Sequence, residues 1–170
     1  MSYQSFEQVL QKCHTEEKEF WRVILEDDMA ERNVSEEDSM EHMRATWDAM
    51  LLAAATYEGN LNSSSGLVGG DGRRMEEYIR SAQTKSLCGE YVDTCIAGAL
   101  QMGESNACMK RIVAAPTAGA CGVLPAVLVP YFQKRCRNTD KILKAMYVAA
   151  GIGQIIATRS SISGAAGGCQ

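Results

Sequence analysis

Glycine and proline are confined to the second part of this chain, and no other feature limits its possible folds as strongly. Residues 1–58 contain neither, whereas residues 59–170 hold all 15 glycines and all three prolines. Because these two residues interrupt helices most strongly, the front suits long helices and the back suits helices broken by loops. The charge changes at the same place, from 14 acidic and 5 basic side chains in the front to 7 and 12 in the back. The sequence predicts an acidic helical scaffold followed by a site-bearing part.

The overall composition indicates a single domain over residues 1–170. Of its residues, 46% are hydrophobic and 22% are charged, so the chain is long enough for one core and too apolar to be disordered. Its net charge of −4 argues against nucleic-acid binding, which favours basic surfaces. The seven cysteines form no CxxC pair, and the N-terminus lacks a signal-peptide pattern. We expect free thiols in a cytoplasmic protein, most of them packed, with Cys88 and Cys95 sharing a packed helix face.

The glycine-free front is predicted to be helical in two stretches. Residues 4–32 show a polar surface around apolar positions, which is typical of a helix. Ser35 precedes three acidic residues and predicts a helix start, because its hydroxyl can accept the third helical amide. Apolar residues then recur at spacings of three and four. Gly59 is expected to end this helix in a left-handed conformation.

The glycine-rich back is predicted to alternate loops and helices. Residues 59–72 form a loop with five glycines. Helices are expected over residues 73–82, 86–103 and 140–158, the last entered at Asp140. The alternating pattern of a half-buried strand is found nowhere, so the predicted fold class is all-α, a helical domain with glycine-rich loops.

A run of 22 residues without charge, residues 112–133, has the length of a membrane span. Three prolines and two glycines lie within it, and two basic residues flank it on each side. Because proline is costly inside a helix, the run favours a buried loop followed by a helix. We therefore expect no membrane association.

Two loops carry residue types that bind small anions. The serine loop, residues 63–72 (SSSGLVGGDG), combines glycine amides with serine hydroxyls and is followed by Arg73 and Arg74. It lacks the Gly-Lys-Ser/Thr of a P-loop, so an anion site and a plain connection both remain open. In the threonine loop, residues 114–122 (AAPTAGACG), Thr117 and the following amides precede a helix, where a carboxylate would be favoured.

A third loop, residues 160–170 (SSISGAAGGCQ), places a cysteine among small residues. Small neighbours leave room for an inorganic group, so Cys169 is a candidate metal or cluster ligand as well as a plain thiol. Cys121 has no histidine context that would make it a nucleophile, because both histidines lie in the acidic front. The lysines stand mostly among charged residues, which does not favour a pyridoxal phosphate (PLP) site.

Three strings together resemble one family: SSSGLVGGDG at 63–72, NACMKRIVAAPTAGACGVLPAVL at 106–128, and AAGIGQIIATRSSISGAAGGCQ at 149–170. In order and spacing they are similar to the alpha chain, or catalytic domain, of bacterial iron–sulfur-dependent L-serine dehydratases, over nearly the whole chain. The resemblance implies an all-helical lyase, L-serine ammonia-lyase. Such an enzyme converts L-serine to pyruvate and ammonia by β-elimination in amino-acid degradation and gluconeogenesis. One departure is the absence of an acidic residue near Ala165 and Ala166.

The resemblance also implies a [4Fe–4S] cluster and no PLP. Cys169 matches one of three cysteine ligands of the family, and the other two would lie beyond this chain. The chain is therefore expected to be a catalytic domain cut short at its C-terminus, inactive alone and unable to assemble a complete cluster. In the family's reaction, the iron without a cysteine ligand acts as a Lewis acid on the substrate.

The substrate carboxylate of this reaction needs preorganised donors. Two loops supply the assigned residues, which are Ser65, Gly66, Thr117, Ala118 and Gly119, with Asn106, Ser161 and Ser163 as weaker candidates. The sequence does not identify the catalytic base. The expected partners are L-serine and a beta subunit, a second copy of the chain, or both.

Two other functions remain open. The loops would recognise a carboxylate rather than the leaving group, so a related iron–sulfur lyase acting on L-cysteine fits the same residues. The apolar helices also fit a non-catalytic helical interaction module that pairs with a partner or with itself.

Overall fold

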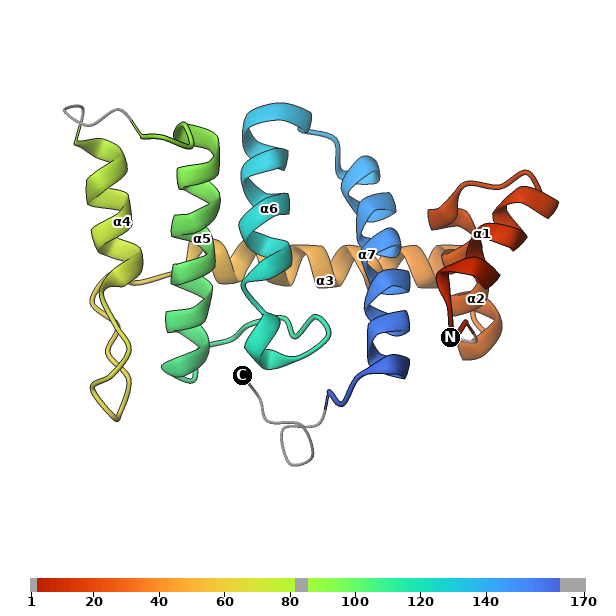
Figure 1. The fold of residues 1–170 in the computed structure, drawn as a ribbon, viewed down its shortest axis with the longest axis horizontal. Coiled ribbons are helices and arrows are strands. Elements are labelled where there is room, and N and C mark those ends of the chain that lie inside the picture. Colours follow the sequence, from red (N-terminus) through yellow and green to blue (C-terminus); the bar gives the residue numbers. More distant parts are fainter. Residues whose placement is uncertain (1–2, 82–85, 163–170) are drawn as a thin grey trace. The chain divides into compact units, whose positions relative to one another are not determined.

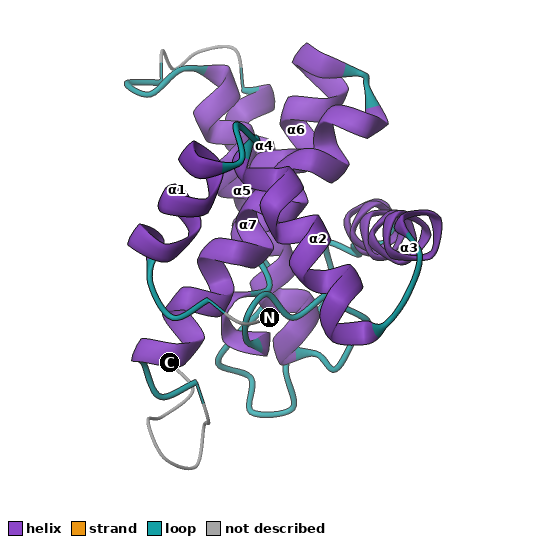
Figure 2. Ribbon diagram, turned by 90° about the vertical axis from the view of Figure 1, so that its right-hand side faces the viewer, coloured by secondary structure: helices purple, strands orange, loops and turns teal. Residues whose placement is uncertain are grey.

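The computed structural model of the chain describes residues 3–81 and 86–162. Every regular element in these ranges is a helix, which confirms the all-α prediction (Figure 1, Figure 2). The elements are α1 (Phe6–Thr15), α2 (Phe20–Arg32), α3 (Glu36–Ala55), α4 (Asp71–Arg80), α5 (Glu90–Ala107), the 3₁₀ turn η1 (Ala118–Ala120), α6 (Val123–Tyr131), the π turn η2 (Phe132–Cys136) and α7 (Thr139–Arg159).

The helices form two compact units, of which the first joins residues 1–47 to 138–170 and the second is residues 48–137. Neither boundary coincides with the change of composition at residue 59. The division into an acidic scaffold and a site-bearing part therefore stays a prediction about function.

The first unit contains α1, α2, the beginning of α3, and α7. Its core is a cluster of buried side chains from three of these helices: Val9, Val23, Ile24, Leu25, Tyr147 and Ile155. Gly151 allows close packing of α7 on α2, because a Cβ atom there would lie 2.6 Å from Cδ1 of Ile24. A buried bond of 2.6 Å between the hydroxyls of Ser39 and Tyr147 connects α3 to α7 within this core.

The helical prediction for residues 4–32 is confirmed, but the stretch forms two helices, because a turn separates α1 from α2. Glu17 in this turn has a left-handed φ of 51°. The reversal follows from packing, since Val9 of α1 must reach the same cluster as Val23 and Ile24 of α2. Periodicity along one segment does not reveal where that segment folds back.

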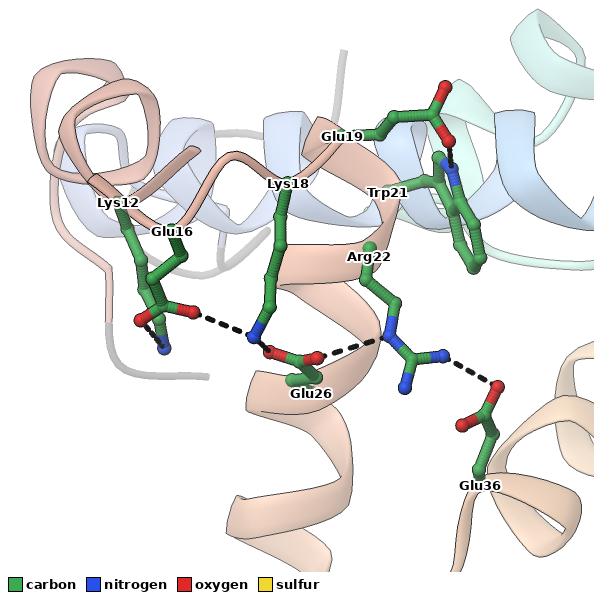
Figure 3. Close-up of polar contacts among 8 residues, drawn as sticks. All are labelled: Lys12, Glu16, Lys18, Glu19, Trp21, Arg22, Glu26 and Glu36. Carbon is green, nitrogen blue, oxygen red and sulfur yellow. Dashed lines mark hydrogen bonds and ion pairs between the residues drawn. The ribbon is translucent and has the colours of Figure 1, made fainter. Parts of the chain in front are cut away.

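Ion pairs around this turn use the acidic side chains of the front (Figure 3). Lys18 Nζ lies 2.7 Å from both Glu16 and Glu26, and Arg22 links Glu26 at 3.0 Å to Glu36 at 2.6 Å. The bond from Lys18 lowers the pKa of Glu26, and the bond from Arg22 lowers the pKa of Glu36. The stability that these carboxylates contribute is therefore lost as the pH falls through their lowered pKa values.

The start of α3 confirms the predicted cap, whereas its end does not. Ser35 Oγ accepts the Asp38 amide at 3.1 Å, and the Asp38 carboxylate accepts the Ser35 amide at 3.3 Å. The helix ends at Ala55, and Gly59 has no left-handed φ, so the predicted cap at Gly59 is wrong. Gly59 is instead a point of close packing, because a Cβ atom there would lie 3.2 Å from Cβ of Arg73.

The second unit contains the end of α3 followed by α4, α5 and α6, which Figure 1 shows side by side. Small residues form the contact between α5 and α6. A Cβ atom at Gly122 would lie 3.0 Å from the Ala99 carbonyl oxygen, and one at Gly98 would lie 3.4 Å from Cα of Ala126. The glycines of this part therefore bring helices together as well as forming loops.

The uncharged run forms a loop and then a helix, as predicted, but residues 112–120 are half-buried or exposed, so the predicted burial of the loop is wrong. Residues 112–117 have no helix, η1 follows, and α6 begins at Val123. Pro125 lies in the first turn of α6, where its missing N–H is not needed. Pro130 removes a helical hydrogen bond near the end, and η2 follows directly after α6. Within the described ranges, no helix combines the length and the apolar character needed to cross a bilayer.

Several predicted boundaries are shifted. Helix α4 begins at Asp71 rather than residue 73, α5 occupies Glu90–Ala107 rather than 86–103, and Asn138 rather than Asp140 caps α7. Because α5 begins so late, Cys88 precedes it and is exposed, while Cys95 is half-buried. The prediction that these two cysteines share a packed helix face is therefore wrong.

Exposed apolar stripes run along α5 and α6. The stripes consist of Val92, Ile96 and Leu100 on α5, and of Val123, Val127 and Tyr131 on α6. Members of each stripe are four residues apart, which places them on one face of their helix. Burial within the second unit thus accounts for only part of the apolar sequence of α6.

Alanine substitutions at two glycines of α7 are expected to change the stability of the protein in opposite directions. Gly151→Ala inserts a methyl group against the buried Ile24 side chain and should destabilise the protein by about 1 kcal/mol or more. Gly153→Ala meets no atom within 4 Å and should stabilise the helix by about 0.5–1 kcal/mol. Urea denaturation of both variants measures the change. Stabilisation by both would show that α7 does not pack closely on α2 at Gly151.

Candidate functional site

The serine loop and the threonine loop lie at the same end of the second unit, before α4 and before α6 (Figure 1). Helix α5 also ends at this end of the second unit. Two side chains of its last turns, Glu104 and Asn106, hold the two loops. The two predicted carboxylate-binding loops are therefore anchored to one short stretch of a single helix.

Glu104 is a buried carboxylate, with an exposed fraction of 2%. Its Oε1 atom accepts the backbone amides of Asp71 at 2.5 Å and of Gly72 at 3.0 Å, the first two residues of α4. Its Oε2 atom accepts the Tyr57 hydroxyl at 2.5 Å. The positive end of the α4 dipole and these charge-assisted bonds offset the loss of hydration of the carboxylate.

The surroundings of this carboxylate are closely packed. Burial and the bond to Glu104 raise the pKa of Tyr57, so its hydroxyl stays protonated and remains a donor. Gly72 is buried, and a Cβ atom there would lie 2.7 Å from Cγ of Gln101 and 2.8 Å from the Tyr57 hydroxyl oxygen. The lack of a side chain at Gly72 therefore allows the first turn of α4 to reach Glu104.

Glu104 changes the interpretation of the serine loop. The anion at the start of α4 is a carboxylate of the protein itself, so the first two amides of this helix are not available to an external ligand. Arg73 and Arg74 pair with acids of their own helix, at 2.9 Å to Glu77 and 2.7 Å to Asp71. The part of the loop that can contact a ligand is its exposed tip.

The tip of the serine loop is a tight turn that exposes Ser65 and Gly66. Ser63 closes this turn, since its amide donates to the Val68 carbonyl at 2.8 Å and its carbonyl accepts the Gly66 amide at 2.8 Å. Gly66 has a left-handed φ of 72°, which glycine adopts without strain. Because the Gly66 amide is used within the turn, the assigned donor of the tip is the Ser65 hydroxyl, which lies 3.1 Å from the Ser63 hydroxyl and accepts the Leu67 amide at 3.4 Å.

The threonine loop leads into η1, and Asn106 fixes this turn. Its Nδ2 atom donates to the Ala118 carbonyl at 3.2 Å, and the Ala120 amide closes the turn on the Thr117 carbonyl at 3.1 Å. The amides of Ala118 and Gly119 precede this first helical bond, where helix geometry leaves amides open to external acceptors. Ala118 and Gly119 are exposed and Thr117 is half-buried, so all three can be reached from solvent.

Most of the third predicted loop lies outside the described residues. Ser161 is exposed and belongs to the first unit. Ser163 and Cys169 lie outside the described residues. Their roles in the site stay predictions.

Within residues 3–81 and 86–162, no group of three or more histidine, cysteine, aspartate or glutamate side chains could hold a metal ion. Cys121 in the threonine loop is buried, donates from Sγ to the Met102 carbonyl at 3.7 Å, and has a thiol pKa raised by its burial. A buried thiol with a raised pKa is a poor ligand and a poor nucleophile. Cys121 is therefore a packing residue.

A groove of about 340 Å³ lies between α3, α4, α5 and α6 in the second unit. Its wall includes a bond of 2.6 Å from Gln101 to Glu76, and most of its other lining residues are apolar. It contains none of the predicted site residues. The donors Arg80, Thr94 and Gln133 also line the groove, but the loops carry the residues predicted to bind a carboxylate, so the loops are the candidate site.

Glu104 and Tyr57 are not among the site residues predicted from the sequence. A signal for Glu104 exists, because it falls two helical turns after the buried Ala97 and shares its face of α5. An acid on a buried face implies a compensating partner. No comparable signal marks Tyr57, which lies outside any helix and 47 residues before Glu104.

Comparison with known protein families assigns the chain to one of them. The family described as "Serine dehydratase alpha chain" matches residues 15–170. The chain therefore belongs to the serine dehydratase alpha chain family. This finding confirms the resemblance identified from the three sequence strings.

The relatives are similar over different lengths. The probable L-serine dehydratase alpha chain of Bacillus subtilis (strain 168) is 34% identical over 148 residues, which cover 87% of this chain and 49% of the relative. The L-serine dehydratase alpha chain of Peptoniphilus asaccharolyticus is 31% identical over 167 residues, or 96% and 56%. L-serine dehydratase 2 of Escherichia coli (strain K12) is 46% identical over 74 residues, or 42% and 16%. The chain spans about half the length of the first two relatives, and no solved structure matches it.

Cys88 and Cys121 are expected to differ in reactivity towards iodoacetamide. Cys88 is exposed and should be alkylated rapidly at pH 8, whereas Cys121 should stay unmodified in the folded protein, because burial blocks access and raises its thiol pKa. Mass spectrometry of the digested protein measures both, and alkylation in urea provides the control in which both react. Rapid modification of Cys121 without urea would show that the threonine loop is open around this thiol.

Proposed function

We propose that the chain provides the substrate-carboxylate site of an L-serine dehydratase, a lyase that converts L-serine to pyruvate and ammonia. The observation that carries this proposal is the anchoring of the serine and threonine loops by Glu104 and Asn106, within the segment that matches the family. The names of the relatives support L-serine as the substrate. The free thiols of the six described cysteines support a reducing, cytoplasmic compartment.

The proposed reaction is a β-elimination without net oxidation or reduction. A base takes the Cα proton of L-serine, the Cβ–O bond breaks, and the hydroxyl group leaves as water after it gains a proton. The resulting aminoacrylate becomes an imine, which water hydrolyses to pyruvate and ammonia. One water molecule leaves and one enters, so L-serine yields one pyruvate and one ammonia.

Uncharged donors of the two loops are proposed to hold the carboxylate throughout this reaction. The serine loop contributes the Ser65 hydroxyl, and the threonine loop contributes the Thr117 hydroxyl with the amides of Ala118 and Gly119. Fixed donors of this kind orient a carboxylate without the motion of a long basic side chain. Gly66 shapes the turn, because its amide is already used within it.

A [4Fe–4S] cluster with Cys169 as one ligand is proposed on the family resemblance alone. The described residues do not themselves fit such a cluster, since they contain no suitable group of ligands and Cys121 is buried. The proposed cluster would therefore need Cys169 together with cysteines that are not among the described residues. The designation of the relatives as alpha chains supports a beta subunit as a partner.

Loss of a loop hydroxyl is expected to weaken substrate binding. In the assembled enzyme, Ser65→Ala and Thr117→Ala should each raise the KM for L-serine by roughly tenfold, because a hydrogen bond to a charged group is lost. The kcat should change less, since the carboxylate is bound in both the ground state and the transition state. Ser64→Ala is the matched control, because Ser64 is exposed in the same loop and is not assigned to substrate. Pyruvate release at varied L-serine concentration measures all three.

Other outcomes of this experiment would change the assignment. An unchanged KM in both loop variants would remove the loops from substrate binding. Faster pyruvate release from L-cysteine than from L-serine would indicate a cysteine lyase. Release of pyruvate from neither substrate would favour a non-catalytic helical module.

Removal of the Cys169 thiol is expected to remove the cluster. Cys169→Ser should abolish activity and the visible iron–sulfur absorption of the enzyme when the assembled protein is purified without oxygen, because clusters are held by thiolates. Cys88→Ser should retain both, since Cys88 lies in none of the matching strings. Iron and sulfide analysis with absorption spectra provides the measurement. A Cys169→Ser enzyme with full iron content and activity would exclude Cys169 as a ligand.

A further inference from the structure

We propose that Glu104 is a positioning residue that sets the serine loop for substrate binding, an inference that rests on the proposed function. Glu104 does not contact the substrate itself, because it is buried and carries the same negative charge as the substrate carboxylate. It acts on the backbone at the point where the serine loop enters α4. The consequence for catalysis is therefore indirect and geometric.

The serine loop is fixed internally, so its base determines where its tip lies. At the tip, Ser63 closes the turn that presents Ser65. Further down, Gly69 lies against the opposite side of the loop, since a Cβ atom there would be 2.3 Å from the Leu61 carbonyl oxygen. These contacts tie the two sides of the loop to each other. Its orientation on the second unit then depends on the attachment of its base.

The base of the loop joins α4 through Gly70, and a glycine by itself does not fix the direction of the chain. Gly70 has a φ of 83°, and a Cβ atom there would meet nothing within 4 Å. Its carbonyl accepts the Arg74 amide at 3.0 Å and Arg74 Nε at 3.3 Å, so α4 holds the carbonyl side of this residue. The next two residues, Asp71 and Gly72, are the ones whose amides Glu104 accepts. Because glycine has the greatest backbone freedom, these two bonds add a restraint on the direction in which the loop leaves α4.

The same stretch of α5 also sets the other half of the site. Asn106 follows Glu104 by two residues, about 3 Å along the helix axis, and holds the Ala118 carbonyl at 3.2 Å. The spacing between the Ser65 hydroxyl and the donors of the threonine loop is thus fixed through a single rigid element. A looser bond at Glu104 would change that spacing and weaken the binding of the carboxylate.

The variant Glu104→Gln tests the charge while preserving the shape. Its carbonyl oxygen can still accept the two amides, but the charge that strengthens these bonds is lost, and its NH₂ group can only donate towards Tyr57. In the assembled enzyme the KM for L-serine should rise tenfold or more while kcat changes less than threefold. Hydrogen exchange of residues 63–72 should accelerate at least tenfold, and exchange of residues 123–131 should stay unchanged.

Glu76→Gln is the matched control. Glu76 is also an acid that joins α4 to α5, through a bond of 2.6 Å from Gln101, but no bond from Glu76 to an amide of the serine loop is found among the described residues. This variant should lower the melting temperature and leave the KM and the exchange of residues 63–72 within twofold of wild type. Tyr57→Phe removes the bond at Oε2 of Glu104, leaves both bonds at Oε1, and should give the pattern of Glu104→Gln with a two- to fivefold rise in KM. It provides the test if Glu104→Gln does not fold.

The outcomes separate this inference from the proposed function. A lower melting temperature for Glu104→Gln with unchanged KM and unchanged exchange in residues 63–72 would overturn the inference and make Glu104 a core residue only. Exchange does not require substrate. A wild-type enzyme that releases no pyruvate, combined with faster exchange in the variant, would refute the proposed function while supporting the hold of Glu104 on the loop.

Discussion

One buried carboxylate determines how the second unit is assembled. A carboxylate that loses its hydration without compensation is strongly destabilising, so Glu104 requires donors at close range. Each of its three donors places a demand on the chain. Helix α4 must start at Asp71, its second residue must be glycine, and Tyr57 must lie next to α5. The serine loop lies in the segment between Tyr57 and α4. The three bonds to Glu104 therefore place this loop near the end of α5, where Asn106 holds the threonine loop.

Glycine has two distinct roles in this chain: it permits turns in loops, and it permits close packing between elements. At Gly66 it permits the left-handed turn that displays Ser65. At Gly72, Gly122 and Gly151 it permits one element to approach another more closely than any side chain would allow. The glycine-rich back is therefore as much a device for helix packing as a source of loops. The lack of glycine in residues 1–58 corresponds to helices whose packing is completed by larger side chains, such as Ile24.

Local signals in the sequence were sufficient wherever neighbouring residues decide the structure. The cap formed by Ser35 and Asp38, and the loop and helix within the uncharged run, depend on residues a few positions apart. The turn at Glu17 and the start of α4 depend on contacts distant in sequence, which no local pattern contains. The site shows the same limit. Hydroxyl residues could be predicted by type, but the use of the Gly66 amide within its turn depends on the folded backbone.

Both loop anchors bind the main chain of the loops and none of their side chains. Glu104 accepts amides at the start of α4, and Asn106 donates to the carbonyl of Ala118. An anchor of this kind requires no particular side chain in the loop, except that position 72 must be glycine. On the proposed function, exchanges at positions such as 65 or 117 would alter what the loops bind and leave the bonds from Glu104 and Asn106 intact. The scaffold thus separates recognition from support, so mutation could explore new substrates without first rebuilding the helices.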